Sequence, residues 1–228
     1  MLTLEAKLYG KTEQFKALDE AIRTAQFIRN YCIRYWMDNI GVGQYDLSAL
    51  TKDLAKQFAW CGQLNSSARQ ASAQRAWASI KRFYDNCKKQ IPGKKGFPRF
   101  KKNVRSVEYK KSGWKLSEDR KTITLTDGFK AGTFKLRGGY DLHFYSTNQI
   151  KRVRIVRRSD GYYIQLCIDV ERKVKHDFTG KVTGIDLGLE HFYTDAEGNQ
   201  INNPRYLRKS DKRLKRLQKR LSRKSQRW

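Results

Sequence analysis

The sequence predicts an α+β protein, in which a small antiparallel β-barrel with an inserted helical bundle precedes short strands and a long basic helix. Three observations predict this arrangement. Residues 2–9 alternate apolar and polar side chains, residues 12–88 carry apolar side chains at helical spacing, and short alternating segments follow residue 103. Because an unpaired strand edge is unfavourable, we expect residues 2–9 to complete the barrel.

Three helices are expected between the first strand and the rest of the barrel. The first begins at Thr12, which we take as its N-cap, and ends before Gly41. The second covers residues 47–58, and the third begins after Asn65. In each, apolar side chains recur three and four residues apart and so share one face.

Residues 88–102 form a basic linker with seven cationic residues and no acidic one. Its prolines and glycines prevent regular structure. Such a charge run predicts contacts with backbone phosphates. The residues expected to make these contacts are Lys94, Lys95, Arg99, Lys101 and Lys102, while the interleaved Phe97 and Phe100 either stack on bases or pack on the barrel.

The barrel strands are expected in the region that follows the linker. Alternating segments at 104–109, 122–125, 133–136 and 141–146 precede a long hairpin, whose arms at 150–158 and 162–170 flank Asp160-Gly161.

A separate unit begins after Gly180. It opens with an apolar strand at 182–189, a second strand, and a turn at Gly198-Asn199. Asn203 is expected to cap a helix that has Pro204 in its first position. The last 24 residues hold twelve Lys or Arg and one acid. From this basic helix we expect phosphate contacts by Arg205, Arg208, Lys209, Lys212, Arg213, Arg216 and Arg220.

Composition limits the function. A net charge of +27 over 228 residues excludes an ordinary near-neutral enzyme and favours a nucleic acid as partner, with an anionic membrane surface as the weaker alternative. The hydrophobic content of 39% excludes a disordered basic tail. The sequence has no spanning segment or signal peptide, so a cytoplasmic protein without a membrane partner is expected. The cysteine spacing indicates neither a disulfide framework nor a zinc site.

Asp186 is the sharpest candidate for chemistry. It lies in an otherwise apolar segment, where a carboxylate is costly to bury unless it is paired or bound to metal. Gly184 and Gly188 would allow close approach of backbone or phosphate. The alternative is an Asp that caps a turn or pairs with a lysine. The histidines show no metal-ligand or nucleophile spacing.

Together these segments resemble the TnpB (OrfB) proteins of bacterial insertion sequences, the ancestors of type V CRISPR nucleases. The segments that carry the resemblance run in the same order along essentially the whole chain. They are the opening strand, KTEQFKALDEAIRTAQFIRNYCIRYWMDN, GFPRFKK, SGWKLSEDRKTITL, GIDLGL and NPRYLRKSDKRLKRLQKRLSRK.

The resemblance implies a wedge barrel (residues 1–10 and 89–178), an inserted recognition lobe (11–88) and the start of a RuvC nuclease domain of RNase H-like fold (179–228). It also implies a guide RNA that pairs with double-stranded target DNA, while the protein reads a short adjacent motif. On this analogy Gln70 and Gln74 are candidate base readers, since amides can make bidentate contacts to adenine. Such a protein would work in transposition at the prokaryotic nucleoid.

By the same resemblance, Asp186 matches the first of three RuvC carboxylates, which hold two metal ions, usually magnesium. Only 42 residues follow it (228 − 186), too few for the remaining carboxylates and a zinc ribbon. We therefore expect an incomplete site that binds no magnesium tightly and does not cleave alone, unless a separate chain supplies the rest of the domain. The alternative function is a catalytically dead RNA- or DNA-binding module that acts as a target-site repressor.

Overall fold

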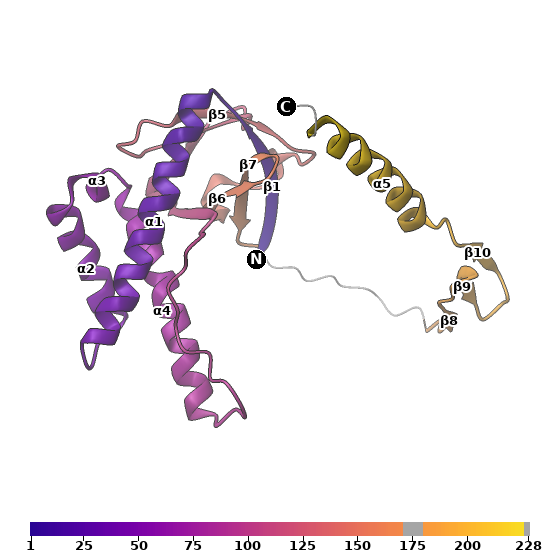
Figure 1. Cartoon of the computed structure of the whole chain (residues 1–228), viewed down its shortest axis with the longest axis horizontal. Helices are drawn as coiled ribbons and strands as arrows, with labels where there is room; N and C mark the ends of the chain where they lie inside the picture. The colour runs from indigo at the N-terminus through magenta and orange to yellow at the C-terminus, as the bar shows by residue number, and fades with distance from the viewer. Residues whose placement is uncertain (171–179, 226–228) are drawn as a thin grey trace. The chain divides into compact units, whose positions relative to one another are not determined.

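The computed structural model describes residues 1–170 and 180–225, with residues 209, 224 and 225 described by their backbone alone. The chain divides into two units, Met1–Arg172 and Lys173–Trp228 (Figure 1). The first unit holds a sheet and a group of helices, and the second holds three short strands and one helix. The mixed α+β class expected from the sequence is confirmed.

A seven-stranded antiparallel sheet organises the first unit. Its order is β2-β6-β7-β1-β5-β4-β3. Leu4 of β1 pairs with Leu166 of β7, and Ala6 pairs with Ile164, so apolar side chains of both strands face the core. The bounds are β1 (Leu2–Tyr9), β2 (Ser106–Lys110), β3 (Trp114–Leu116), β4 (Thr122–Leu125), β5 (Gly132–Arg137), β6 (Ile150–Arg158) and β7 (Gly161–Ile168).

The sheet curls into a nearly closed barrel. Its two edge strands, β2 and β3, follow one another in the chain and are separated only by a 3-10 turn, η1 (Lys111–Gly113). This short connection keeps the two edges near one another. β1 lies between β7 and β5, which confirms that the first strand completes the sheet built by the later part of the chain.

Four helices separate β1 from the other strands. They are α1 (Thr12–Asp38), α2 (Gln44–Gln57), the single-turn α3 (Ala59–Gly62) and α4 (Ser66–Lys88). The ring of Phe15 in α1 stacks on Tyr162 of β7 at 4.9 Å between centroids, so helices and sheet share one hydrophobic core. α4 begins after Asn65 as expected, and the side chain of Asn65 caps it by accepting a hydrogen bond from the Ser67 amide (2.8 Å).

A buried carboxylate joins α4 to the barrel. Asp127, in the loop between β4 and β5, accepts hydrogen bonds from the Asn65 backbone amide (2.8 Å) and the Tyr109 hydroxyl (2.5 Å). Burial raises the pKa of Asp127, and burial together with this carboxylate raises the pKa of Tyr109 well above its ordinary value. The start of α4 is therefore fixed to two separate parts of the sheet.

The second unit has a three-stranded antiparallel sheet in the order β10-β9-β8. Its strands are β8 (Ile185–Asp186), β9 (His191–Asp195) and β10 (Gln200–Asn202), and the helix α5 (Tyr206–Ser225) follows them. The turn expected at Gly198-Asn199 joins β9 to β10, with the Gly198 amide bonded to the Asp195 carbonyl (3.1 Å).

Several expectations about local structure are wrong. Residues 141–146 form a 3-10 turn, η2 (Leu142–Phe144), because the Asp141 carboxylate accepts from the His143 amide (2.9 Å) and favours a turn. The strand expected at 182–189 pairs over only two residues, since Gly184 and Gly188 weaken it.

The expected starts of two helices also differ. α5 begins after Pro204, because the side chain of Asn203 accepts a hydrogen bond from the amide of Arg205, which adopts a positive φ of 48°. Lys11, in place of Thr12, is the N-cap of α1.

The long hairpin is present, but its turn lies one residue earlier than expected. Arg158 pairs with Gly161, which leaves Ser159-Asp160 as the two turn residues. Gly161 has a φ of +136°, which an L side chain rarely adopts, so a glycine is required here as expected. It is, however, the first residue of β7 and not a residue of the turn. Among the helices of the described ranges, none combines the length and apolar content required to cross a bilayer.

Replacing Tyr109 by Phe should lower the free energy of unfolding by about 1–3 kcal/mol, because the buried Asp127 carboxylate loses a donor. The loss should depend on pH. A carboxyl whose folded-state pKa is raised is favoured protonated, so the stability that it contributes is lost as pH rises through that pKa. Since the substitution raises this pKa further, the destabilisation should be larger at neutral than at acidic pH.

Urea unfolding of both proteins at neutral and acidic pH measures this difference. Tyr9→Phe, which removes a half-exposed hydroxyl with one long contact to Arg137 (3.4 Å), is the matched control and should leave stability unchanged. A Tyr109→Phe loss of equal size at both pH values would contradict the expectation.

Candidate nucleic-acid interface

Lys88 is the last residue of α4, and from residue 89 the basic segment has no regular secondary structure, as expected, but its backbone is held against α1. The amide side chain of Asn30 donates to the carbonyl of Lys101 (2.9 Å) and accepts from the Lys101 amide (2.9 Å). The guanidinium of Arg29 donates to the carbonyl of Arg99 (3.2 Å). The segment is therefore an ordered part of the fold, held to α1 through its backbone.

Two further bonds fix the path of the chain on either side. Asn86 of α4 donates to the carbonyl of Lys95 (3.0 Å), and the amide of Val104 donates to Gln26 of α1 (2.8 Å). Contacts with α1 thus move from residue 30 to residue 26 as the segment advances from 101 to 104. The segment runs along α1 in the opposite direction to the helix.

An aromatic group attaches the middle of the segment to the helices. The ring of Phe97 lies 5.6 Å from that of Trp36 in α1 and 5.2 Å from that of Phe83 in α4, measured between centroids. Phe97 therefore packs on the helical bundle and not on the barrel. About half of its side chain stays exposed (53%).

Segment, α1 and α4 together enclose an open groove of about 640 Å³, which we call the linker groove. Among the described residues, no acidic side chain lines it. Arg29 lines it and is buried; burial, and then the nearby Arg75, lower the pKa of Arg29. The cations that line the groove are Arg29, Arg82, Lys94, Lys95, Arg99 and Lys101.

The linker groove brings together four of the five cations predicted in this segment: Lys94, Lys95, Arg99 and Lys101. The fifth, Lys102, lines a neighbouring hollow of about 630 Å³, which we call the strand-end hollow. Four arginines line this hollow as well: Arg23, Arg105, Arg157 and Arg158. Its acidic lining residue, Asp19, is already bonded to Arg157 (3.0 Å) and to the Tyr162 hydroxyl (2.6 Å).

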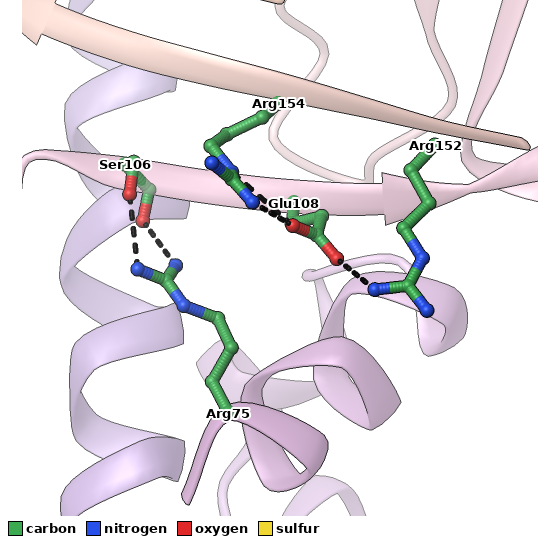
Figure 2. Close-up of polar contacts among 5 residues, drawn as sticks. All are labelled: Arg75, Ser106, Glu108, Arg152 and Arg154. Carbon is green, nitrogen blue, oxygen red and sulfur yellow. Dashed lines mark hydrogen bonds and ion pairs between the residues drawn. The ribbon is translucent and has the colours of Figure 1, made fainter. Parts of the chain in front are cut away.

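A second cationic cluster lies where α4 meets β2 and β6 (Figure 2). Glu108, only 5% exposed, accepts from Arg152 (3.3 Å) and from Arg154 (2.8 Å). Arg75 donates instead to the carbonyl and hydroxyl of Ser106, both at 3.2 Å. Burial, and then the charge of Arg154, lower the pKa of Arg75. One carboxylate faces three guanidinium groups, so the cluster keeps an excess of positive charge.

Gln70 and Gln74, the predicted base readers, lie on α4 near this cluster and are half-buried. Gln70 accepts a long hydrogen bond from Lys110 of β2 (3.4 Å). Within residues 1–170 and 180–225, the side chain of Gln74 has no hydrogen-bond partner. These contacts leave the proposed base-reading role a prediction.

Asp186 lies on β8 and is exposed, so it is not the buried carboxylate that its apolar surroundings suggested. Its neighbour across the sheet is Thr194. The carboxylate of Asp195, on the neighbouring strand, stabilises the turn between β9 and β10, because the backbone and side-chain nitrogens of Asn199 both donate to it (2.7 and 2.8 Å). The bond from the Asn199 side chain is the main cause that lowers the pKa of Asp195.

The fit to a metal site can be tested on the described residues. They contain no group of three or more His, Cys, Asp or Glu side chains placed to hold a metal ion. Asp186 alone does not match the donor set that two magnesium ions require. The described residues therefore do not by themselves form a two-metal site.

The basic helix α5 is present, and its described cationic side chains are exposed. Leucines 207, 214, 217 and 221 are also exposed within this unit. The predicted phosphate contacts Arg208, Lys212, Arg213, Arg216 and Arg220 lie on α5, Arg205 immediately precedes it, and the side chain of Lys209 lies outside the described residues.

Sequence reasoning missed several cations that the fold adds to these sites. Arg29 had a signal, because it interrupts an otherwise apolar helical stripe, where a charged residue requires an explanation. Arg152 and Arg154 alternate with the buried Val153 and Ile155, as expected of outward-facing strand positions. Arg82 had no comparable signal, since an exposed helix cation is ordinary.

Comparison with known proteins gives two findings. Residues 165–228 match the family model OrfB_IS605, described as "Probable transposase". The chain is also 26% identical over 152 residues to the "Putative RNA-guided DNA endonuclease InsQ" of Escherichia coli (strain K12). That alignment covers 66% of this chain and 35% of InsQ, so the chain spans about a third of the relative that it matches.

Replacing Glu108 by Gln should lower the free energy of unfolding by about 1–3 kcal/mol, because Arg152 and Arg154 lose their buried counter-charge while remaining partly solvated. Chemical denaturation measures the loss. The matched control is Glu20→Gln, which removes an exposed pair with Arg23 in the middle of α1 and should have no measurable effect. Equal stability of the two variants would show that Glu108 does not hold the cluster together.

Proposed function

We propose that this chain, which is similar to the OrfB (TnpB) proteins of insertion sequences, is a nucleic-acid-binding part of an RNA-guided DNA endonuclease, with guide RNA and target DNA as ligands. The observation that carries the proposal is the linker groove. Its six cations face one open space, and the described residues place no acid among them. Phosphate groups are the ligands that suit such a surface.

In this proposal the helices α1–α4 act as the recognition lobe and the seven-stranded sheet as the wedge barrel. Arg75, Arg152 and Arg154 support a second nucleic-acid contact beside Gln70 and Gln74, since their positive charge exceeds that of Glu108. The amides would read base edges while the arginines hold the phosphate backbone. The division follows the logic of RNA-guided recognition, in which the protein grips shape and backbone.

The second unit would be the start of the RNase H-like RuvC domain. Three antiparallel strands followed by a basic helix support this assignment, with Asp186 on the first strand as the first carboxylate. A metal site would then need donors beyond those that the described residues gather. A separate chain could provide them, and α5 would contribute further phosphate contacts.

Replacing Lys94, Lys95 and Arg99 by Gln should weaken nucleic-acid binding, because three phosphate contacts are lost. The slope of log K against log salt, which is negative, should become less steep by about 2–3, at 0.7–0.9 per contact. Fluorescence anisotropy over a salt series measures both effects. The backbone carbonyls of Lys95 and Arg99 that anchor the segment stay in place.

The matched control replaces three exposed cations that do not line the groove: Lys16, Lys52 and Lys56. It removes the same net charge. If both triple variants lose the same affinity and slope, binding follows total charge and the groove is not the site.

A different measurement identifies the natural ligand. The chain is purified through high salt, and the nucleic acid that remains bound is sequenced. One discrete RNA that carries a transposon-end scaffold would support guide binding. Mixed cellular RNA released at modest salt would contradict it and leave only nonspecific attraction to phosphate.

We expect no magnesium-dependent DNA cleavage by the 228-residue chain alone, because two-metal chemistry requires several carboxylates and the described residues gather no such set. A plasmid-nicking assay with guide RNA and magnesium tests this, with Asp186→Ala as the paired variant. Cleavage by the original chain that the substitution abolishes would contradict the expectation.

A further inference from the structure

One exposed aromatic side chain in the basic segment is held in a fixed position. Phe100 lies between the two residues whose backbones are bonded to Arg29 and Asn30 of α1. Its own side chain is 48% exposed. Three hydrogen bonds thus fix the backbone on both sides of a phenyl ring that stays half exposed, which is the arrangement expected of a preformed contact.

Phe100 is part of a larger aromatic surface. With Phe27 and Tyr31 of α1 it lines a shallow hollow of about 520 Å³, which we call the aromatic hollow. Phe27 lies 5.7 Å from Tyr31 and 4.8 Å from Trp60, between ring centroids. Trp60 is itself 44% exposed, so ring faces and edges continue past the hollow.

Cations flank this hollow. Arg23 and Arg34 line it and lie eleven positions apart on α1, about 16 Å along the helix axis. Each is paired with an exposed acid on its own helix, Arg23 with Glu20 (2.6 Å) and Arg34 with Asp38 (2.7 Å). Exposed pairs of this kind contribute little, so either guanidinium can exchange its partner for a phosphate.

The aromatic hollow also adjoins the strand-end hollow, because Arg23 and Gln26 line both. Lys102 and Arg105, in the latter, are exposed, and within the described ranges their side chains have no acidic partner. A ligand that crosses α1 here meets aromatic rings first and uncompensated cations next.

We infer that the aromatic hollow binds unpaired nucleotides, whose bases stack on Phe100, Phe27 and Tyr31 while their phosphates contact Arg23 and Lys102. Stacking on side chains requires free base faces, which a duplex keeps inside its own stack. The inference rests on the proposed function, because both require a nucleic acid as ligand. It adds a second binding surface, separate from the linker groove, and specifies that the ligand there is single-stranded.

The test compares two fluorescein-labelled oligonucleotides of about 12 nucleotides, a typical length for one single-strand site. One is oligothymidine, and the other has the same phosphates with tetrahydrofuran residues in place of the nucleosides. The full chain should bind oligothymidine about tenfold more tightly. Phe100→Leu should remove most of this preference without changing affinity for the abasic strand, and Phe100→Trp should restore it.

The control is Phe144→Leu, which removes an aromatic ring that is 81% exposed elsewhere in the first unit and should keep the full preference. Thermal unfolding confirms that each variant is folded. Equal binding of both strands by the unaltered chain would overturn the inference and leave phosphate binding intact. An unchanged preference in Phe100→Leu would overturn it too, because the bases would stack elsewhere. Binding of neither strand would contradict the proposed function itself.

Discussion

The buried Asp127 carboxylate fixes the helices to the barrel, and the rest of the first unit depends on that junction. It bonds the first turn of α4 through Asn65 and the sheet through Tyr109. A second bond between the same segments, from the Gly128 amide to the Gln63 carbonyl (2.8 Å), reinforces it. Because α4 carries Arg75 and Arg82, this junction sets the position of both cationic clusters.

The few acidic residues of this very basic chain are not spread evenly. Among the described residues, some cations have a carboxylate partner within the fold, whereas others have none. Five cations of the sheet have carboxylate partners, which are Glu108 for Arg152 and Arg154, Asp19 for Arg157, Glu5 for Arg158 and Asp160 for Lys7. In the linker groove the described residues provide none. Because the described part of the fold supplies no counter-charge there, the cations of the groove repel one another. A bound polyanion would relieve this repulsion, so the groove favours such a ligand.

The sequence predicted the long periodic elements well, because each buries one regular face. β1 and α4 occupy the expected ranges, and the central place of β1 in the sheet follows from the need to cover its edges. The errors lie where short-range side-chain bonds override pattern, as at Asp141 and Asn203. Four cations of the linker groove were found from charge alone, whereas Arg82 reached it through helix packing that no local pattern encodes.

The ordered segment 95–104 differs physically from a basic tail of the same composition. A tail loses conformational entropy when it binds, whereas here Asn30, Arg29 and Gln26 have already fixed the backbone during folding. In the proposed function, the phosphate contacts of the linker groove would weaken with salt, whereas base stacking on Phe100 would depend on salt less. Nucleic acid bound at these two surfaces of α1 would then respond differently to ionic strength.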